Sequence, residues 1–202
     1  MLSAEASYDV VDDWRGVSLL TAEFAQGLEA FGASRAGDPL LSRANGRPDF
    51  SRINLGASRL QDLEGDFSLL AEAAGQYAFS QLLASEEFGV GGARFGRAYD
   101  PSEITADHGL AAALELRYGR ELSDPWLRSL QVYGFLDFGA VWRIDDASGD
   151  RRQSRASAGL GVRFNVLEDI SGALEVAQPL TATPLAEDDQ GPRLFFSFVR
   201  RF

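Results

Sequence analysis

The stretch SRASAGLGVRFNV, residues 154–166, alternates apolar and polar residues without a break. From Ala156 to Val166 every even-numbered residue is apolar, while the odd-numbered residues are serine, glycine, arginine and asparagine. A period of two with one apolar face is the pattern of a β-strand whose two faces meet different surroundings. We therefore predict a strand here, with Leu160, Val162 and Phe164 on its apolar face.

The same alternation recurs along most of the chain and predicts about eight strands of roughly 9–13 residues, close to the length of a tilted membrane-spanning strand. Residues 1–13 are acidic and weakly patterned, and we interpret them as the end of another strand. Alternation alone suits equally a membrane barrel with its apolar face outward and a soluble barrel or sandwich with that face inward. The other expected strands are 16–27, 50–61, 67–79, 109–119, 129–143, 170–178 and 193–202.

The connections between these segments alternate in length. Short ones at 62–66, 120–128 and 167–169 separate long ones at 28–49, 80–108, 144–153 and 179–192. Outer-membrane barrels have short periplasmic turns and long extracellular loops. The pattern predicts an all-β, antiparallel transmembrane β-barrel with a periplasmic C-terminus and with loop 80–108 on the outer side.

Composition excludes several functions. The chain of 202 residues has a net charge of −11, which argues against a nucleic-acid partner, and it has no cysteine for a disulfide or thiolate site. His108 is the only histidine, so neither a multi-histidine metal site nor a histidine-based triad is expected. The glycines at 89, 91 and 92 are not followed by the lysine of a phosphate-binding loop. We expect no enzyme, no cofactor and no metal.

Loop 80–108 and the next residue contain the glycine-rich stretch FGVGGARFGRAYDPSEITADHG, residues 88–109. One interpretation is that Arg97 folds back into the barrel and meets Asp137 and Glu115, which lie on the polar faces of two strands. The other is that Arg97 is a solvated loop residue and that both acids line a wet pore. The loop acids could bind a cation, although a solvated acidic loop is the prediction; they are Glu86, Glu87, Asp100, Glu103 and Asp107.

The final residues, LFFSFVRRF, place Phe196, Phe198 and Phe202 on one face of the expected strand 193–202. A terminal phenylalanine after such alternation resembles the signal by which barrel proteins are recognised for membrane assembly. The alternative is an ordinary final strand.

From about residue 16 to residue 202, the chain resembles the C-terminal half of the barrel in the ShlB/FhaC/HecB family. These proteins are outer-membrane transporters of two-partner secretion, related to BamA-type assembly proteins. The stretch 88–109 looks like the family's sixth extracellular loop, and FLDFG at 135–139 matches its Phe-x-Asp-x-Gly strand motif at Phe135, Asp137 and Gly139. ALELR at 113–117 places Glu115 where the family carries an inward acid.

The core of the family's loop, Val-Arg-Gly-Tyr/Phe, falls on Gly96, Arg97, Ala98 and Tyr99. Gly96 replaces the usual valine, and Ala98 replaces the usual glycine. The resemblance implies that Arg97 locks the loop inside the barrel through Asp137 and Glu115, and it favours this lock over a solvated arginine.

By the same resemblance, residues 1–202 are the C-terminal part of a sixteen-stranded barrel whose periplasmic POTRA domains lie outside this chain. The N-terminus has neither the basic nor the apolar region of a secretory signal peptide, so either the chain is a piece of a longer precursor or the membrane interpretation is wrong. The implied function is a pore in the outer membrane of a Gram-negative bacterium that secretes and activates a large haemolysin or adhesin. Implied partners are this exoprotein, the barrel assembly machinery and membrane lipid. The alternatives are a barrel assembly factor and a self-contained eight-stranded structural or adhesion barrel.

Overall fold

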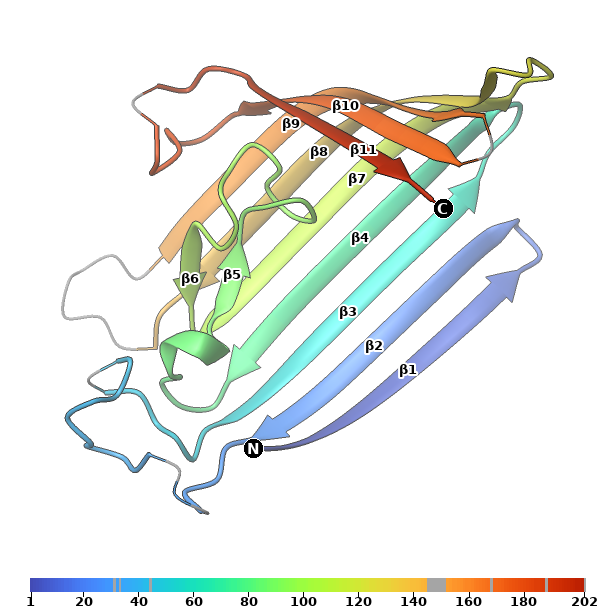
Figure 1. Cartoon of the computed structure of the whole chain (residues 1–202). Coiled ribbons are helices and arrows are strands. Elements are labelled where there is room, and N and C mark those ends of the chain that lie inside the picture. Colours follow the sequence, from blue (N-terminus) through green and yellow to red (C-terminus); the bar gives the residue numbers. More distant parts are fainter. Residues whose placement is uncertain are drawn as a thin grey trace.

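The chain folds into one large antiparallel sheet of nine strands, bent into a trough, in a computed structural model (Figure 1). The structure describes residues 1–30, 32, 34–43, 45–144, 152–167, 169–187 and 189–201. Neighbours in the sheet follow the order β1-β2-β3-β4-β7-β8-β9-β10-β11. These strands are β1 (Leu2–Asp12), β2 (Gly16–Gln26), β3 (Ser51–Asp62), β4 (Phe67–Ala78), β7 (His108–Glu121), β8 (Leu127–Trp142), β9 (Arg152–Val166), β10 (Ile170–Pro179) and β11 (Arg193–Arg200).

Each strand expected from the alternation is present, and the all-β antiparallel fold is confirmed. The N-terminal segment is more than the end of a strand, because β1 pairs with β2 along its whole length, from Leu2 opposite Gln26 to Asp12 opposite Gly16. Loop 80–108 also has structure of its own: a 3-10 turn at Ala84–Glu86 and a two-stranded sheet of β5 (Phe88–Val90) and β6 (Ile104–Ala106).

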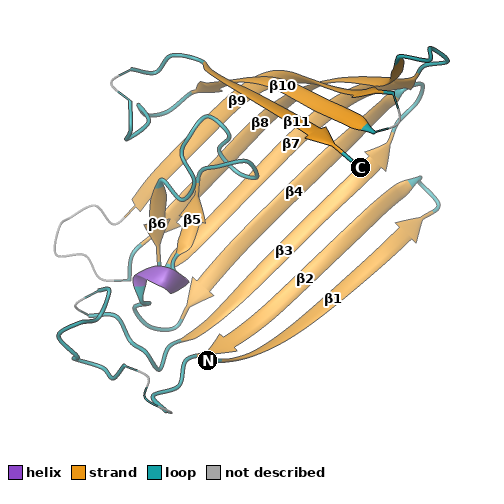
Figure 2. Cartoon of the chain, in the orientation of Figure 1, coloured by secondary structure: helices purple, strands orange, loops and turns teal. Residues whose placement is uncertain are grey.

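The long and short connections lie at opposite ends of the sheet (Figure 2). The turns after β1, β3, β7 and β9 are short, whereas the connections after β2, β4, β8 and β10 are long. Antiparallel pairing of consecutive strands places successive connections at alternate ends of the sheet. The long connections at one end and short turns at the other match the loops and turns of outer-membrane barrels.

Among the described strands the sheet is open, because β1 and β11 each have a neighbour on one side only. The alternative of a self-contained eight-stranded barrel does not match this sheet, which has nine strands among the described residues and whose two end strands do not pair with each other. An unpaired strand edge is not tolerated in lipid, so these two edges are where further strands of a complete barrel would pair.

The two faces of the sheet have the reverse of the polarity found in soluble proteins. In β7, Leu114 and Leu116 are about half exposed on the outer face, whereas Glu115 between them is 3% exposed on the inner face. The same pattern recurs in β8, where Leu136 and Phe138 are exposed and Asp137 is buried. A soluble sandwich would bury the leucines and expose the acids, whereas a membrane barrel shows this pattern.

Exposed aromatic side chains lie near both ends of the strands. Trp14, Trp126 and Phe67 lie at or beside the short turns, and Tyr77 and Phe79 lie where β4 leads into a long connection. Aromatic girdles at both water interfaces are typical of outer-membrane barrels. No helix in the described part of the chain is long and apolar enough to cross a membrane.

Candidate functional site

The loop between β4 and β7 lies within the trough, against the inner face of the sheet (Figure 1). Its small sheet contributes Val90, Ile104 and Ala106 to an apolar cluster with Ala111 of β7 and Val141 of β8. These contacts place the residues between β5 and β6, which include Arg97, over the inner wall. We call residues 91–103 the loop tip.

Gly139 of β8 makes this approach possible. A Cβ atom at Gly139 would overlap the side chain of Val90. The glycine of the strand motif therefore provides the space into which the loop sheet packs.

Arg97 contacts Asp137 through both its side chain and its backbone. Its Nε donates to Asp137 Oδ2 at 3.2 Å, its Nη2 donates to Oδ1 at 3.1 Å, and its backbone N–H donates to Oδ2 at 3.0 Å. The Asp137 side chain is fully buried and that of Arg97 is 9% exposed. Such a two-pronged guanidinium–carboxylate pair fixes orientation as well as distance.

Glu115 completes the predicted group and is shared by several arginines. Arg97 Nη1 donates to Glu115 Oε2 at 2.7 Å, Arg163 of β9 donates to both carboxylate oxygens at 2.7 and 3.2 Å, and Arg117 Nε donates to Oε1 at 2.7 Å. The structure thus brings Arg97, Asp137 and Glu115 together. It also adds Arg163 and Arg117, which sequence reasoning did not assign to the site.

A third carboxylate, Glu175 of β10, was also missed. Its Oε2 accepts from Tyr133 Oη at 2.8 Å and from Arg97 Nη1 at 3.4 Å. Glu175 is the one acid within the alternating stretch 170–178, and this is the feature of the sequence that could have indicated a site residue. Its strand is not adjacent to β7 or β8, so sequence alone gave no reason to place it beside them.

Two of the guanidinium groups stack on aromatic rings of β8. The Cζ atom of Arg97 lies 3.6 Å from the centre of the Phe135 ring, and that of Arg163 lies 3.7 Å from the centre of the Tyr133 ring. Guanidinium groups stack well on aromatic faces. Phe135 of the strand motif is therefore a platform for the loop arginine.

The residues flanking Arg97 anchor the loop tip. Gly96 has a φ of +89°, which favours glycine, and its N–H donates to Asp137 at 3.3 Å. Ala98 is fully buried with Tyr99, whose hydroxyl donates to the carbonyl oxygen of Ala156 at 3.1 Å. The two departures from the family motif are thus compatible with a closely packed tip.

The acids of the loop are paired with arginines, contrary to the prediction of a solvated acidic loop. Glu103 binds Arg155 of β9 at 3.0 Å, and Asp100 binds Arg193 of β11 at 2.8 Å. Glu86 pairs with Arg52 at 3.1 Å. Among the described residues no group of acids and histidine could hold a metal ion.

At its base the loop is held by a second buried ion pair. Arg43, from the connection between β2 and β3, donates to both oxygens of Asp107 at 2.6 and 3.3 Å, and it also lies 2.7 Å from Glu87. The backbone N–H groups of Leu82 and Ile144 donate to Asp107 at 2.7 and 3.0 Å. Burial acts to raise the pKa of Asp107, but these hydrogen bonds outweigh it and hold that pKa below its usual value.

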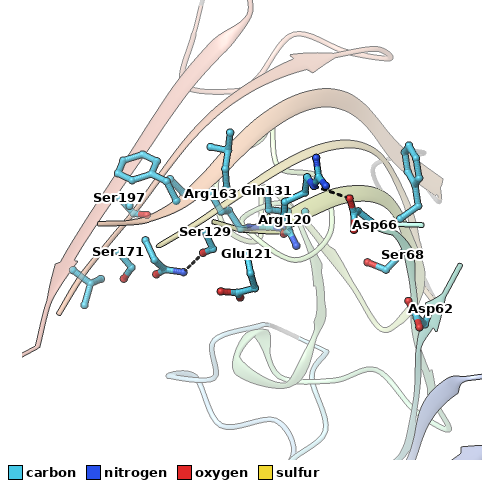
Figure 3. Close-up of a pocket in the computed structure, with 18 of the residues that line it drawn as sticks. Asp62, Asp66, Ser68, Arg120, Glu121, Ser129, Gln131, Arg163, Ser171 and Ser197 are labelled. Carbon is cyan, nitrogen blue, oxygen red and sulfur yellow. Dashed lines mark hydrogen bonds and ion pairs between the residues drawn. The ribbon is translucent and has the colours of Figure 1, made fainter. Parts of the chain in front are cut away.

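A polar cavity of about 660 Å³ opens at the short-turn end of the trough (Figure 3). Polar side chains from seven strands line it, including Ser129, Gln131 and Ser171. Apolar side chains, such as Phe67 and Phe164, also contribute to its lining. Arg163 lines this cavity and also donates a hydrogen bond to Glu115, so one residue links the cavity wall to the ion-pair group.

The proposed assembly signal lies on the last strand. Phe196 and Phe198 of β11 are exposed on the outer face of the sheet, together with Leu194. Phe202 lies outside the described residues. The role of these residues in assembly remains a prediction.

Comparison with known proteins gives two matches. Residues 4–164 match the family model for the haemolysin secretion/activation protein ShlB/FhaC/HecB. The structure is similar to CdiB from Escherichia coli, with a TM-score of 0.78 and 19% sequence identity, over 98% of this chain and 36% of that one. This likeness shows the shared fold, and the chain spans about a third of that protein's length. No curated protein sequence gave a significant match.

Proposed function

The chain belongs to the ShlB/FhaC/HecB family of haemolysin secretion/activation proteins, and from this premise we propose that the complete protein is an outer-membrane pore of two-partner secretion. It passes one large exoprotein, of the haemolysin or adhesin class, to the surface of a Gram-negative cell. The reversed polarity of the sheet, the aromatic residues near both ends and the alternating connections support a membrane location.

The observation that carries the proposal is the position of Arg97. The loop starts and ends at the long-connection end of the sheet, yet it lies within the trough. There its arginine forms ion pairs with acids on β7, β8 and β10. A charged group held this far from bulk water persists only when partners compensate it. In the proposed pore, this ion-pair group holds the loop in the path of the exoprotein. Secretion requires the contact between Arg97 and the acids of the barrel wall.

The test is substitution of Arg97 in the complete protein. Arg97→Ala removes five side-chain and ion-pair contacts with the wall, and we expect secretion to fall by an order of magnitude while the barrel still assembles. Exoprotein in the culture medium measures secretion, and the heat-modifiable mobility of the barrel in outer membranes measures assembly.

Arg94→Ala is the matched control. Arg94 lies in the same loop, but its side chain is 59% exposed; it pairs with Glu72 at 3.3 Å and lies over the ring of Phe95 in its own loop, and such exposed pairs contribute little. Secretion at the wild-type level in Arg97→Ala would contradict the lock. Loss of other outer-membrane barrels on depletion of the protein, with exoprotein release unchanged, would instead support the assembly-factor alternative.

A further inference from the structure

The residues that contact the guanidinium group of Arg97 all belong to strands of the large sheet. The inner wall therefore forms a binding site for a guanidinium group, built from residues outside the loop. Glu115 comes from β7, Phe135 and Asp137 from β8, and Glu175 from β10. Together they present three carboxylates around one aromatic face. We call these four residues the guanidinium cradle.

The three acids of the cradle depend on the loop to different degrees. Without Arg97, Glu115 keeps its contacts with Arg163 and Arg117, and Glu175 keeps its hydrogen bond from Tyr133. These contacts come from the barrel and do not require the loop.

Asp137 is the exception. Four of its five hydrogen bonds come from the loop: from the backbone N–H groups of Gly96 and Arg97 and from Nε and Nη2 of Arg97. Among the donors that the structure describes, only the hydroxyl of Ser157, at 3.2 Å, comes from the wall. When the loop leaves, Asp137 becomes a carboxylate that needs water or an incoming cation.

The same strand shows which cation fits. Tyr133 and Phe135 lie two residues apart on the inner face of β8, and each carries a guanidinium group, with Cζ 3.7 and 3.6 Å from the ring centre. A planar guanidinium group both stacks on the ring and bonds to two carboxylates, which a lysine ammonium group does less well.

An approach to the cradle exists on the lumen side. The lining of a small polar cavity of about 140 Å³ includes Arg97, Glu115, Arg117 and Arg163. Arg163 also lines the larger cavity at the short-turn end. An extended chain that enters from that end therefore passes Arg163 before it reaches the cradle.

We propose that the cradle binds arginine side chains of the translocating polypeptide, which exchange with Arg97 and keep the loop tip displaced during passage. This inference rests on the proposed function, because it needs a polypeptide in the lumen. In the exchange one guanidinium group replaces another at Asp137, so no charge is left uncompensated when the loop moves.

The first experiment uses methylguanidinium as the probe, with the purified complete protein in detergent. In Arg97→Ala the cradle is empty, and millimolar methylguanidinium should raise the thermal unfolding temperature by a few degrees relative to tetramethylammonium at equal ionic strength. Wild type, whose cradle is filled, and Arg97→Ala/Asp137→Asn should show no such selective shift. Equal shifts in all three proteins, or no shift in Arg97→Ala, would overturn the proposal.

The second experiment tests exchange with a peptide. A cysteine in place of Ala98, a fully buried residue of the loop tip, reports tip displacement through its rate of thiol labelling in liposomes. An unstructured peptide with arginines should increase this rate several-fold, whereas the same peptide with neutral citrulline in place of arginine should not. Equal rates with both peptides would overturn the exchange.

The two levels of inference fail separately. If the protein is deleted and exoprotein release continues, the proposed function is wrong, whatever methylguanidinium does. If release depends on the protein but neither methylguanidinium nor the arginine peptide acts selectively, the proposed function stands and the cradle as a cargo site is wrong.

Discussion

The long loop between β4 and β7 is held at its tip and at its base by ion pairs of opposite design. At the tip the loop supplies the cation, Arg97, and the wall supplies the acids. At the base the loop supplies the acid, Asp107, and the cation, Arg43, comes from another long connection.

The two ion pairs differ in the number of chain segments that donate hydrogen bonds to the buried aspartate. Asp137 at the tip receives most of its hydrogen bonds from two consecutive residues, Gly96 and Arg97. Asp107 at the base receives its hydrogen bonds from three separate segments, through Arg43, Leu82 and Ile144. At Asp137 one short segment therefore supplies most of the contacts that must break, whereas Asp107 loses its contacts only if three segments rearrange together.

The largest effect is expected at the base. Asp107→Ala removes the acceptor of four hydrogen bonds and leaves Arg43 with Glu87 as its remaining acidic partner in the described structure, at a cost of about 3–5 kcal/mol. Hydrogen exchange measured by mass spectrometry should show that residues 79–90 lose protection. Unchanged protection would mean that the base is held by its apolar contacts instead.

Asp49→Ala is the control for this change. Asp49 is a partly exposed acid that pairs with Arg47 at 2.6 Å in the connection that also carries Arg43. Its removal should cost about 0–1 kcal/mol and leave the exchange of residues 79–90 as in wild type.

A smaller effect is expected where the loop sheet meets the wall. Gly139→Ala places a methyl group against Val90, and we expect a cost of about 1–3 kcal/mol to loop seating without loss of the barrel. Faster proteolysis of the loop, with heat-modifiable mobility retained, is the expected result. In the control Gly75→Ala, the new Cβ has its nearest neighbours at 3.4 and 3.6 Å, and loop proteolysis should stay slow.

The smallest effect is that of pH on the base. The pKa of Asp107 is lowered in the folded protein, so its contribution is complete above the unfolded value of 3.8 and is lost as the pH falls through the folded value. The difference in unfolding temperature between wild type and Asp107→Asn should be constant from about pH 5 to 8 and shrink below about pH 4. If the difference in unfolding temperature shrinks near neutral pH instead, a group other than Asp107 causes the pH dependence.

The sequence predicts the sheet well because each strand shows its two faces in its own alternation. The strand 154–166 and the connection lengths needed no information from neighbouring strands. β1 was underestimated although its even-numbered residues from Leu2 to Val10 are apolar, and its pairing with β2 is complete.

The ion-pair group at the tip was predictable only in part. Arg97, Asp137 and Glu115 lie in short motifs, whereas Arg163 and Glu175 lie on strands that come together only through the register of β8 with β9 and of β9 with β10. The register of a sheet is a property of several strands together, and a single strand does not carry it. The pairing of the loop acids was missed for the same reason, since Arg155 and Arg193 belong to distant strands.

Arg193 has a consequence for the order of folding. It lies on the last strand of the sheet, and it donates to the carbonyl oxygen of Ala98 and to Asp100, which precede it by 95 and 93 residues. Contacts between residues so far apart in sequence form late, because a long chain must first be closed. The loop tip therefore gains its contacts with Arg193 only after β11 has joined β10, so the addition of this strand and the seating of the loop are coupled steps.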